Sequence, residues 1–147
     1  MREKEIIMSN ILKLIAQNDE QLTILSSLAQ DSIIKSNEMG YDKKNKRFAL
    51  LMNRYRHEEE SPSRIRTAIH FDYVNSVKSV GIDKQSKDDI LVLLAIRFEG
   101  KSKPSGLIFL EFSNNKSLSF DVESIEAFLT DMGEPWKIPN KPIHGED

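Results

Sequence analysis

The sequence predicts a mainly antiparallel β fold of the α+β class, with about seven short strands between an N-terminal and a C-terminal helix. Hydrophobic and polar residues alternate through much of the region 32–122, as they do in half-buried strands. The connections between these runs have hairpin length, and connections of that length join antiparallel strands. Apolar residues recur at helical spacing mainly at 19–30 and 125–132.

The first helix is expected at 19–30, after a segment at 11–16 that suits a short strand. Asn18 is a suitable N-cap, and Gln21 follows three residues later, as in a capping box. Behind this cap, apolar residues recur at helical spacing: Leu22, Leu25, Leu28 and Ala29.

The strands expected next differ in how clearly the sequence marks them. The segment 64–71 alternates strictly, with Ile65 and Phe71 among the residues of one face. Valines at a spacing of three indicate a bulged strand at 73–82, with a short helix as the alternative. The full set of expected strands is 32–37, 48–57, 64–71, 73–82, 90–98, 107–112 and 118–122, the last two joined by a tight turn at Asn114 and Asn115.

A second helix is expected at 125–132, with Gly133 as its C-cap and Pro135 preventing its continuation. We expect this helix to close the open end of a strongly bent sheet, a small barrel or a two-sheet sandwich. The order of elements is similar to that of a pleckstrin-homology domain, and the likeness is one of element order alone. Four apolar residues fall at i, i+3, i+4 and i+7 of the helix: Ile125, Phe128, Leu129 and Met132.

Length and composition limit the domain organisation and the chemistry. The chain has 147 residues, which suits one hydrophobic core, and we place the single globular domain at 11–133. It would follow an N-terminal extension at 1–10 and precede a Pro-rich C-terminal tail at 134–147, which Trp136 is expected to pin to the domain. A net charge of −2 argues against nucleic acid as a partner. Cysteine is absent, which excludes disulfides and cysteine-ligated metals.

The hydropathy of the chain predicts a cytoplasmic protein without a membrane span. The apolar run at 6–8 is too short for the core of a signal peptide. The longest nearly apolar stretch, 90–98, is about half as long as a membrane-spanning helix and contains Arg97.

Five blocks of sequence carry a resemblance to a known family. They are LKLIAQNDEQL at 12–22, RFALLMNRY at 47–55, IHFDYVNSVKSVGID at 69–83, LLAIRFE at 93–99 and DVESIEAFL at 121–129. In this order they resemble the bacterial domain-of-unknown-function family 2948, a group of small proteins without an assigned activity. The resemblance implies a bacterial source, and it implies that Met8 is the native start.

The sequence predicts no catalytic, cofactor-binding or metal-binding residue. None of the three histidines lies within a helical turn of another, so the paired spacing of a metal site is missing. The six glycines form no phosphate-binding pattern. Adjacent acids at 58–60 are expected to face solvent, whereas paired acid and base catalysis needs carboxylates in different environments.

The strongest candidate site is a set of arginines that we expect to bind an anion or a partner. Pairing of 48–57 with 64–71 is expected to bring all four arginines to one face of the sheet, near one end. Guanidinium groups bind phosphate and carboxylate with two hydrogen bonds. The alternative is an ordinary charged rim that the acids at 58–60 neutralise. The candidate residues are Arg54, Arg56, Arg64 and Arg66, with His70 further along the same strand.

Several strands carry apolar residues on both faces, so the second face needs a cover. The helix at 19–30 is expected to cover part of it, and we expect a monomer, with a homodimer as the alternative. The function that fits best is a non-catalytic interaction module that binds a protein or peptide at a sheet edge or groove. Anion binding by the arginines is the second hypothesis. An enzyme is the third, because the sequence lacks the groups that a reaction needs.

Overall fold

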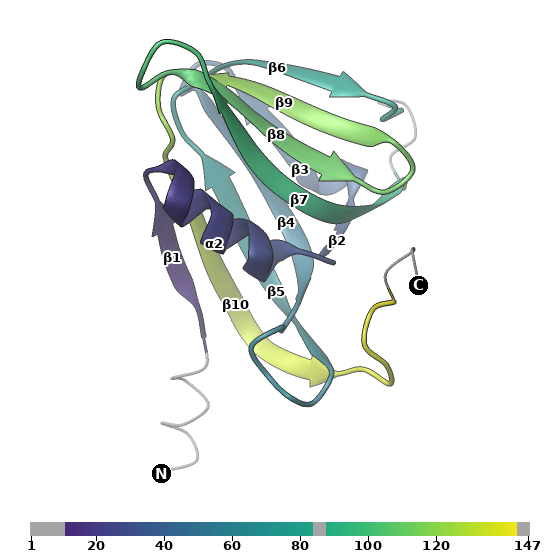
Figure 1. Cartoon of the computed structure of the whole chain (residues 1–147). Helices are drawn as coiled ribbons and strands as arrows, with labels where there is room; N and C mark the ends of the chain where they lie inside the picture. Colours follow the sequence, from purple (N-terminus) through teal and green to yellow (C-terminus); the bar gives the residue numbers. More distant parts are fainter. Residues whose placement is uncertain (1–10, 84–87, 144–147) are drawn as a thin grey trace.

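A computed structural model describes residues 11–83 and 88–143 of the chain. In this part of the chain, ten strands form one antiparallel sheet, with one α-helix and one short 3₁₀ turn (Figure 1). The helix is α2 (Asp19–Ala29) and the turn is η1 (Ser36–Glu38). The strands are β1 (Lys13–Ala16), β2 (Ile33–Lys35), β3 (Met39–Asp42), β4 (Arg47–Tyr55), β5 (Ser63–Phe71), β6 (Val74–Val80), β7 (Ile90–Gly100), β8 (Gly106–Phe112), β9 (Lys116–Val122) and β10 (Ala127–Lys137).

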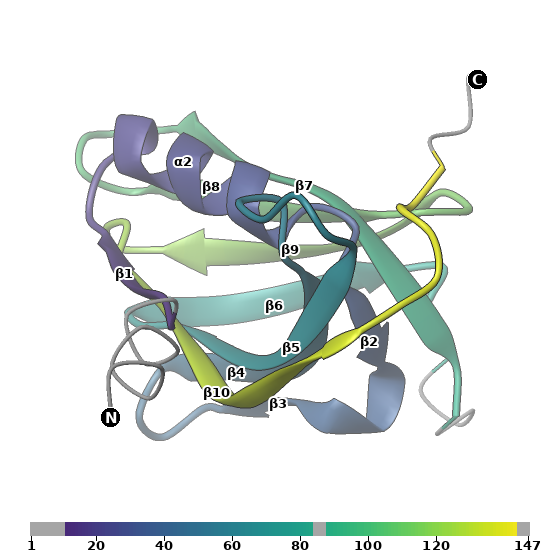
Figure 2. The ribbon, with the colours of Figure 1, turned by 90° about the horizontal axis from the view of Figure 1, so that it is seen from below.

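The sheet bends into two layers that β2 connects (Figures 1 and 2). The first layer has the order β1, β10, β5, β4, and β3 pairs with the N-terminal half of β4. The second layer has the order β7, β8, β9, β6. In β2, Ile33 lies opposite Asn53 of β4 and also opposite Val92 of β7, so the short strand belongs to both layers.

The hydrophobic core lies between the two layers. Phe120 of β9 contacts Phe48 of β4 and Phe71 of β5, with ring centroids 4.6 and 5.1 Å apart. Helix α2 covers one open side of this core and packs mainly on β7. Its Ser26 Oγ accepts a hydrogen bond from Ile96 N at 2.8 Å, which gives β7 a partner along a stretch that β2 does not reach.

The start of α2 is as the sequence predicts. Asn18 is the N-cap, and its Oδ1 accepts a hydrogen bond from Gln21 N at 2.8 Å. The Gln21 side chain accepts in turn from Gln17 N at 2.8 Å, one residue earlier than in a standard capping box. The two side chains therefore satisfy amide groups that have no partner inside the helix.

Three further local predictions are confirmed. In β5, Ile65, Ile69 and the other residues of their face are buried, while the intervening residues are partly exposed. The register between β6 and β9 shifts between Val74 and Ser76, as expected for a bulge. Asn114 and Asn115 have φ of 63° and 59° in the turn between β8 and β9, which is the backbone of a type I′ hairpin.

The predicted fold class is wrong in its counts, because ten strands and one helix replace about seven strands and two helices. The expected C-terminal helix is strand β10. In this strand Ala127, Leu129 and Asp131 are buried, while Phe128 and Thr130 are only partly so, which is the period of a strand. Pairing with β1 on one edge and β5 on the other supplies the backbone hydrogen bonds, and this overrides the helical spacing.

This correction changes how the core is closed. Gly133 has φ of 76° and lies where the β10–β5 register shifts, instead of capping a helix. The N-terminal helix α2 covers the core in place of a C-terminal one, so the element order on which the pleckstrin-homology likeness rested is absent. Strand β3, which lies between the expected strands at 32–37 and 48–57, is the other strand that was not predicted.

The described residues cover only part of the expected N-terminal extension and C-terminal tail. The extension at 1–10, with Met8, lies outside the described residues. Strand β10 continues to Lys137, where Trp136 lies opposite Arg64 of β5, so the start of the expected tail is attached to the domain. No helix in the described ranges is long and apolar enough to cross a membrane.

A pair of alanine substitutions tests the strand assignment of β10. Leu129 is fully buried, so Leu129→Ala should lower the free energy of unfolding by about 2–5 kcal/mol. Met132 is 44% exposed on the other face, so Met132→Ala should cost less than about 1 kcal/mol. Urea unfolding measures both. Equal large losses would indicate one helical stripe that carries both residues, and would contradict the strand.

Candidate functional site

The four predicted arginines do not share one face of the sheet. Arg54 of β4 lies opposite Ile65, and Tyr55 lies opposite Arg64. Even-numbered residues of β4 therefore lie opposite odd-numbered residues of β5, so Arg54 points into the core while Arg64 and Arg66 are on the outer face. The expectation of a common face is therefore wrong. The loop between β4 and β5 sets the register of the pair, and residue numbers within either strand do not reveal that register.

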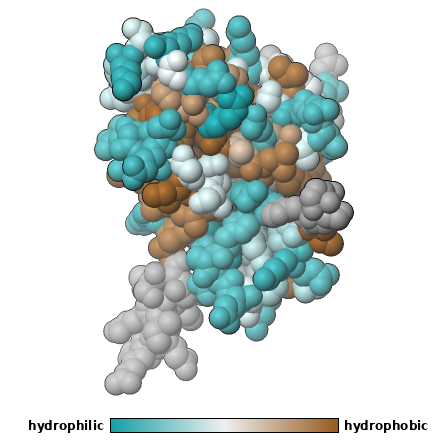
Figure 3. All heavy atoms as spheres, in the orientation of Figure 1, coloured by the Kyte–Doolittle hydropathy of each residue, from teal (hydrophilic) through white to brown (hydrophobic). Residues whose placement is uncertain are grey.

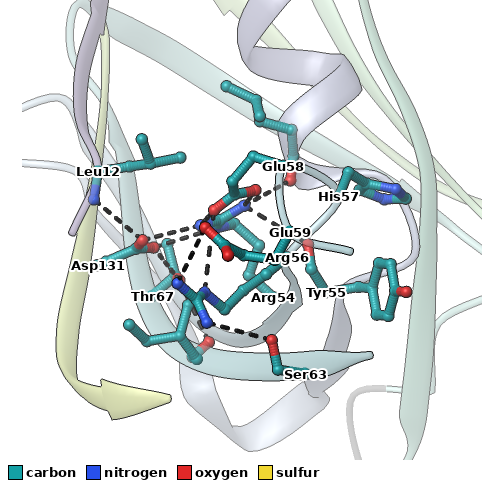
Figure 4. Close-up of polar contacts among 12 residues, drawn as sticks. Leu12, Arg54, Tyr55, Arg56, His57, Glu58, Glu59, Ser63, Thr67 and Asp131 are labelled. Carbon is teal, nitrogen blue, oxygen red and sulfur yellow. Dashed lines mark hydrogen bonds and ion pairs between the residues drawn. The ribbon is translucent and has the colours of Figure 1, made fainter. Parts of the chain in front are cut away.

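Arg54 is the centre of a buried ionic network (Figure 4). Its side chain is fully buried, and it donates to Asp131 from Nε at 3.0 Å and from Nη2 at 2.8 Å. It also donates to Glu58, from Nη1 at 3.0 Å and from Nη2 at 2.8 Å. Two carboxylates thus bind one guanidinium, each through two hydrogen bonds, and this geometry offsets the cost of burying charge.

Asp131 connects the strands around this arginine. Its Oδ1 accepts from Thr67 Oγ1 of β5 at 2.7 Å, and its Oδ2 accepts from Leu12 N at 3.1 Å. Its own amide donates to Leu12 O at 2.9 Å. Asp131 was not predicted as a site residue because it fell within the expected helix at 125–132. One signal in the sequence could have identified it. Ala127, Leu129 and Asp131 alternate with more polar or exposed positions, and an acid in such a buried series needs a partner.

Arg54 and Glu58 each favour their charged form. Burial works to lower the pKa of Arg54, but hydrogen bonds to Glu58 and Asp131 outweigh it, and the net effect is a raised pKa. Burial works to raise the pKa of Glu58, but the hydrogen bonds and the charge of Arg54 leave that pKa below its ordinary value. The charges therefore stabilise one another.

Arg56 lies next to this network and is also largely buried, at 7% exposed. Its Nη1 donates to Ser63 Oγ at 3.2 Å, and its Nη2 is 3.5 Å from Glu59 Oε2. Its Nε is buried without a hydrogen-bond partner among the described atoms. A hollow of about 190 Å³ adjoins it, with Trp136 and Lys137 also in its wall.

The remaining candidates lie on the outer face of β5. Arg64 Nη1 donates to the carbonyl oxygens of Asp31 at 2.9 Å and Asn53 at 3.0 Å, and burial lowers its pKa. Arg66 is paired with Glu38 and donates to Asn53 Oδ1 at 3.1 Å. All four arginines therefore donate to acceptors within the chain, and an added anion would compete with those acceptors.

His70 lies apart from the arginine network. Its ring stacks on Phe128, with centroids 4.6 Å apart, and its Nδ1 is 3.5 Å from Asp72 Oδ1 without a hydrogen bond. Burial and the nearby Arg47 lower the pKa of His70, while Asp72 acts in the opposite direction. The neutral imidazole fits a sheet face that is largely apolar.

Two of the larger hollows differ in their lining. One, of about 700 Å³, lies at the β3–β4 turn, and its charges pair with each other: Lys46 with Glu123 at 2.8 Å and Arg47 with Asp72 at 2.6 Å. The other, of about 440 Å³, lies between β3 and β6, and we name it the β3–β6 groove. The residues that line this groove are Ser36, Asn37, Met39, Gly40, Tyr41, Phe48, Val77, Ser79, Ile82, Asp83 and Leu118.

The β3–β6 groove has an apolar floor and a polar rim. Phe48, Val77 and Leu118 pack on or belong to the hydrophobic core, so the floor is continuous with it. Tyr41 Oη donates to Val74 O at 2.7 Å and holds β3 to the start of β6. In the described chain β3 pairs only with β4, and β6 pairs only with β9, so each strand has an unpaired edge.

Comparison with known proteins identifies a family and no activity. The family model described as "Protein of unknown function (DUF2948)" matches residues 12–144, nearly the whole chain. The chain belongs to family DUF2948. This confirms the resemblance that the five sequence blocks indicate. Searches of curated proteins and of solved structures find no match.

The DUF2948 chain shows no assembled metal site in the part that the structure covers. No group of three or more histidine, cysteine, aspartate or glutamate side chains is placed to hold a metal ion within 11–83 and 88–143.

Substitution of Asp131 tests how far the fold depends on the network. Asp131→Asn leaves the Arg54 guanidinium buried with half of its ionic partners, and it should lower the free energy of unfolding by about 3–5 kcal/mol. Glu111→Gln is the control, because it removes an exposed partner that lies 3.0 Å from Arg97, and it should cost less than about 1 kcal/mol. Denaturant unfolding measures both. Equal small losses would show that the buried pair contributes no more than a surface pair.

The pH dependence of stability tests Glu58. Its pKa is lowered from an ordinary value of 4.5, so its contribution is complete above that value and is lost as the pH falls through the folded-state pKa. Wild type should therefore be more stable than Glu58→Gln at neutral pH, and the difference should shrink below about pH 4. Unfolding curves across this range measure the difference. A difference that does not change with pH would contradict the ionic role.

Proposed function

We propose that this DUF2948 chain is a non-catalytic interaction module that binds an extended, partly apolar peptide segment in the β3–β6 groove. The observation that carries the proposal is the combination of an apolar floor with two strands that each have an unpaired edge. An unpaired strand edge offers backbone amide and carbonyl groups to an added strand.

The size and lining of the groove support this proposal. Its volume of about 440 Å³ falls within the range of about 300–1,000 Å³ that is usual for ligand sites. In strand addition, the backbone supplies affinity and pockets for alternate side chains supply specificity. Met39, Tyr41 and Val77 could receive the apolar side chains of such a segment, while Ser79 and Asn37 could bind polar groups at the rim.

The residues of β3 and β6 favour access to the groove. Gly40 lines the groove and brings no side chain to its wall. In β6, the two residues that line the groove are Val77 and Ser79, and both are partly exposed. Both strands are therefore accessible without a rearrangement of the core.

The other hypotheses have less support. Anion binding by the arginines stays a prediction, and the acceptors that already bind Arg54, Arg64 and Arg66 count against it. Catalysis also stays untested, and none of the described clusters joins a nucleophile, a base and an open cavity. The bacterial source and the cytoplasmic location remain expectations from the sequence.

Binding of short peptides tests the proposal. A phage-displayed library of random peptides is selected on the folded chain, and ¹⁵N chemical shifts then locate the enriched peptides. We expect sequences that alternate apolar and polar residues, with shifts concentrated at Tyr41, Val77 and Ser79. Ser79→Arg places a long cation in the groove and should weaken binding at least tenfold, or about 1.4 kcal/mol.

The matched control is Ser76→Arg, which places the same side chain on the other face of β6, where Ser76 is paired with Asp121 of β9. It should bind the selected peptides with unchanged affinity. Enriched peptides that bind Ser79→Arg as tightly as wild type, or a selection without enrichment, would contradict the proposal.

A further inference from the structure

Arg56 carries a buried guanidinium group whose donors are only partly used. It follows directly after β4, and it is 7% exposed. Its Nη1 donates to Ser63 Oγ at 3.2 Å, whereas its Nε is buried without a hydrogen-bond partner in the described chain. Its Nη2 faces Glu59 Oε2 at 3.5 Å, an ion pair that is longer than a charge-assisted hydrogen bond. The Nε–Nη2 edge of Arg56 therefore has no closely bound acceptor.

Arg54 shows what the same edge does when an acceptor is in place. Its Nε and Nη2 donate to Asp131 at 3.0 and 2.8 Å. From Arg56, Nε is 4.0 Å from Glu58 and Nη2 is 3.5 Å from Glu59. Both oxygens of Glu58 already accept from Arg54, so Glu58 is held away from Arg56. A buried donor without an acceptor costs free energy, so an added acceptor at this edge would be stabilising.

The strand register places a second cation near Arg56. Arg56 N donates to Ser63 O at 3.0 Å, and Lys137 of β10 lies opposite Ser63. These residues form one row across neighbouring strands, and residues opposite one another have their side chains on the same face. Lys137 is exposed, and it forms no ion pair with any residue of 11–83 or 88–143. Two cations therefore flank the Ser63 hydroxyl group.

The hollow beside this row has room for a single charged group. Its volume of about 190 Å³ is below the range of about 300–1,000 Å³ that is usual for the site of a whole ligand. Ser61 and Trp136, which is 42% exposed, are also in its wall. The β4–β5 loop lies at the lower end of the molecule in Figure 1, and the corresponding surface in Figure 3 is mainly hydrophilic. The surroundings favour a polar group over an apolar side chain.

We propose that this hollow binds one oxyanion group, a carboxylate or a phosphate, between Arg56 and Lys137. The anion replaces the Glu59 carboxylate at the Nε–Nη2 edge and accepts a hydrogen bond from each nitrogen, as Asp131 does from Arg54. Glu59 is half-buried in the β4–β5 loop, and among the described residues its side chain makes only the 3.5 Å ion pair with Arg56. Its carboxylate can therefore turn towards solvent, and Lys137 adds the second positive charge.

The indole N–H signal of Trp136 in ¹H–¹⁵N spectra tests the proposal. Trp136 is the only tryptophan of the chain and lies in the wall of the hollow, so its signal reports on this place alone. We expect a saturable shift on titration with inorganic phosphate or with acetate at constant ionic strength. Saturation by phosphate alone would assign a phosphate-bearing ligand, and saturation by acetate alone would assign a carboxylate. Sodium chloride should give no saturable shift.

Substitutions test the role of each charge, with circular dichroism confirming that the variants are folded. Arg56→Lys keeps the charge but loses the paired donors, so affinity should fall about tenfold. Glu59→Gln removes the competing carboxylate and should raise affinity about threefold, a gain that a loss of structure would not produce. The matched control is Lys78→Gln, which removes an exposed cation from β6 and should leave affinity unchanged.

Three results would overturn the proposal. They are the absence of a saturable shift with either anion, an affinity that Arg56→Lys leaves unchanged, and weaker binding by Glu59→Gln than by wild type. The β3–β6 groove is lined by other residues, so none of these results bears on the peptide proposal.

Discussion

The fold depends on one buried cation. Arg54 enters the core from β4 without any solvent contact, and an unpaired charge there would cost several kcal/mol. Asp131 of β10 binds it and is held in turn by Thr67 of β5 and the backbone of Leu12 beside β1. The network therefore specifies the neighbours and the register of four strands, while hydrophobic contacts supply most of the stability.

Helix α2 closes the core on one side, and the described sheet ends elsewhere in strand edges that have no partner. These are the edges of β3 and β6, and the apolar groove lies between them.

Local signals predicted the fold where one interaction decides the structure. Asn18 determines the start of α2, and the paired Asn114 and Asn115 determine a turn. The segment from Ile125 to Met132 carries both a helical and an alternating period, and only its strand neighbours decide between them. The same holds for the site. Arg54 was predicted as one of four candidate arginines, but the face it occupies depends on strand register, and Asp131 lies 77 residues away in sequence.

Native-state hydrogen exchange at the Asp131 amide tests the organising role of the arginine most directly, because this amide donates to Leu12 O at 2.9 Å. In wild type it should exchange only through global unfolding. In Arg54→Met, with the core otherwise intact, protection should be lost first at Asp131 and along β1. Protection in Arg54→Met that falls equally in both layers, or not at all, would show that the cation does not organise these strands.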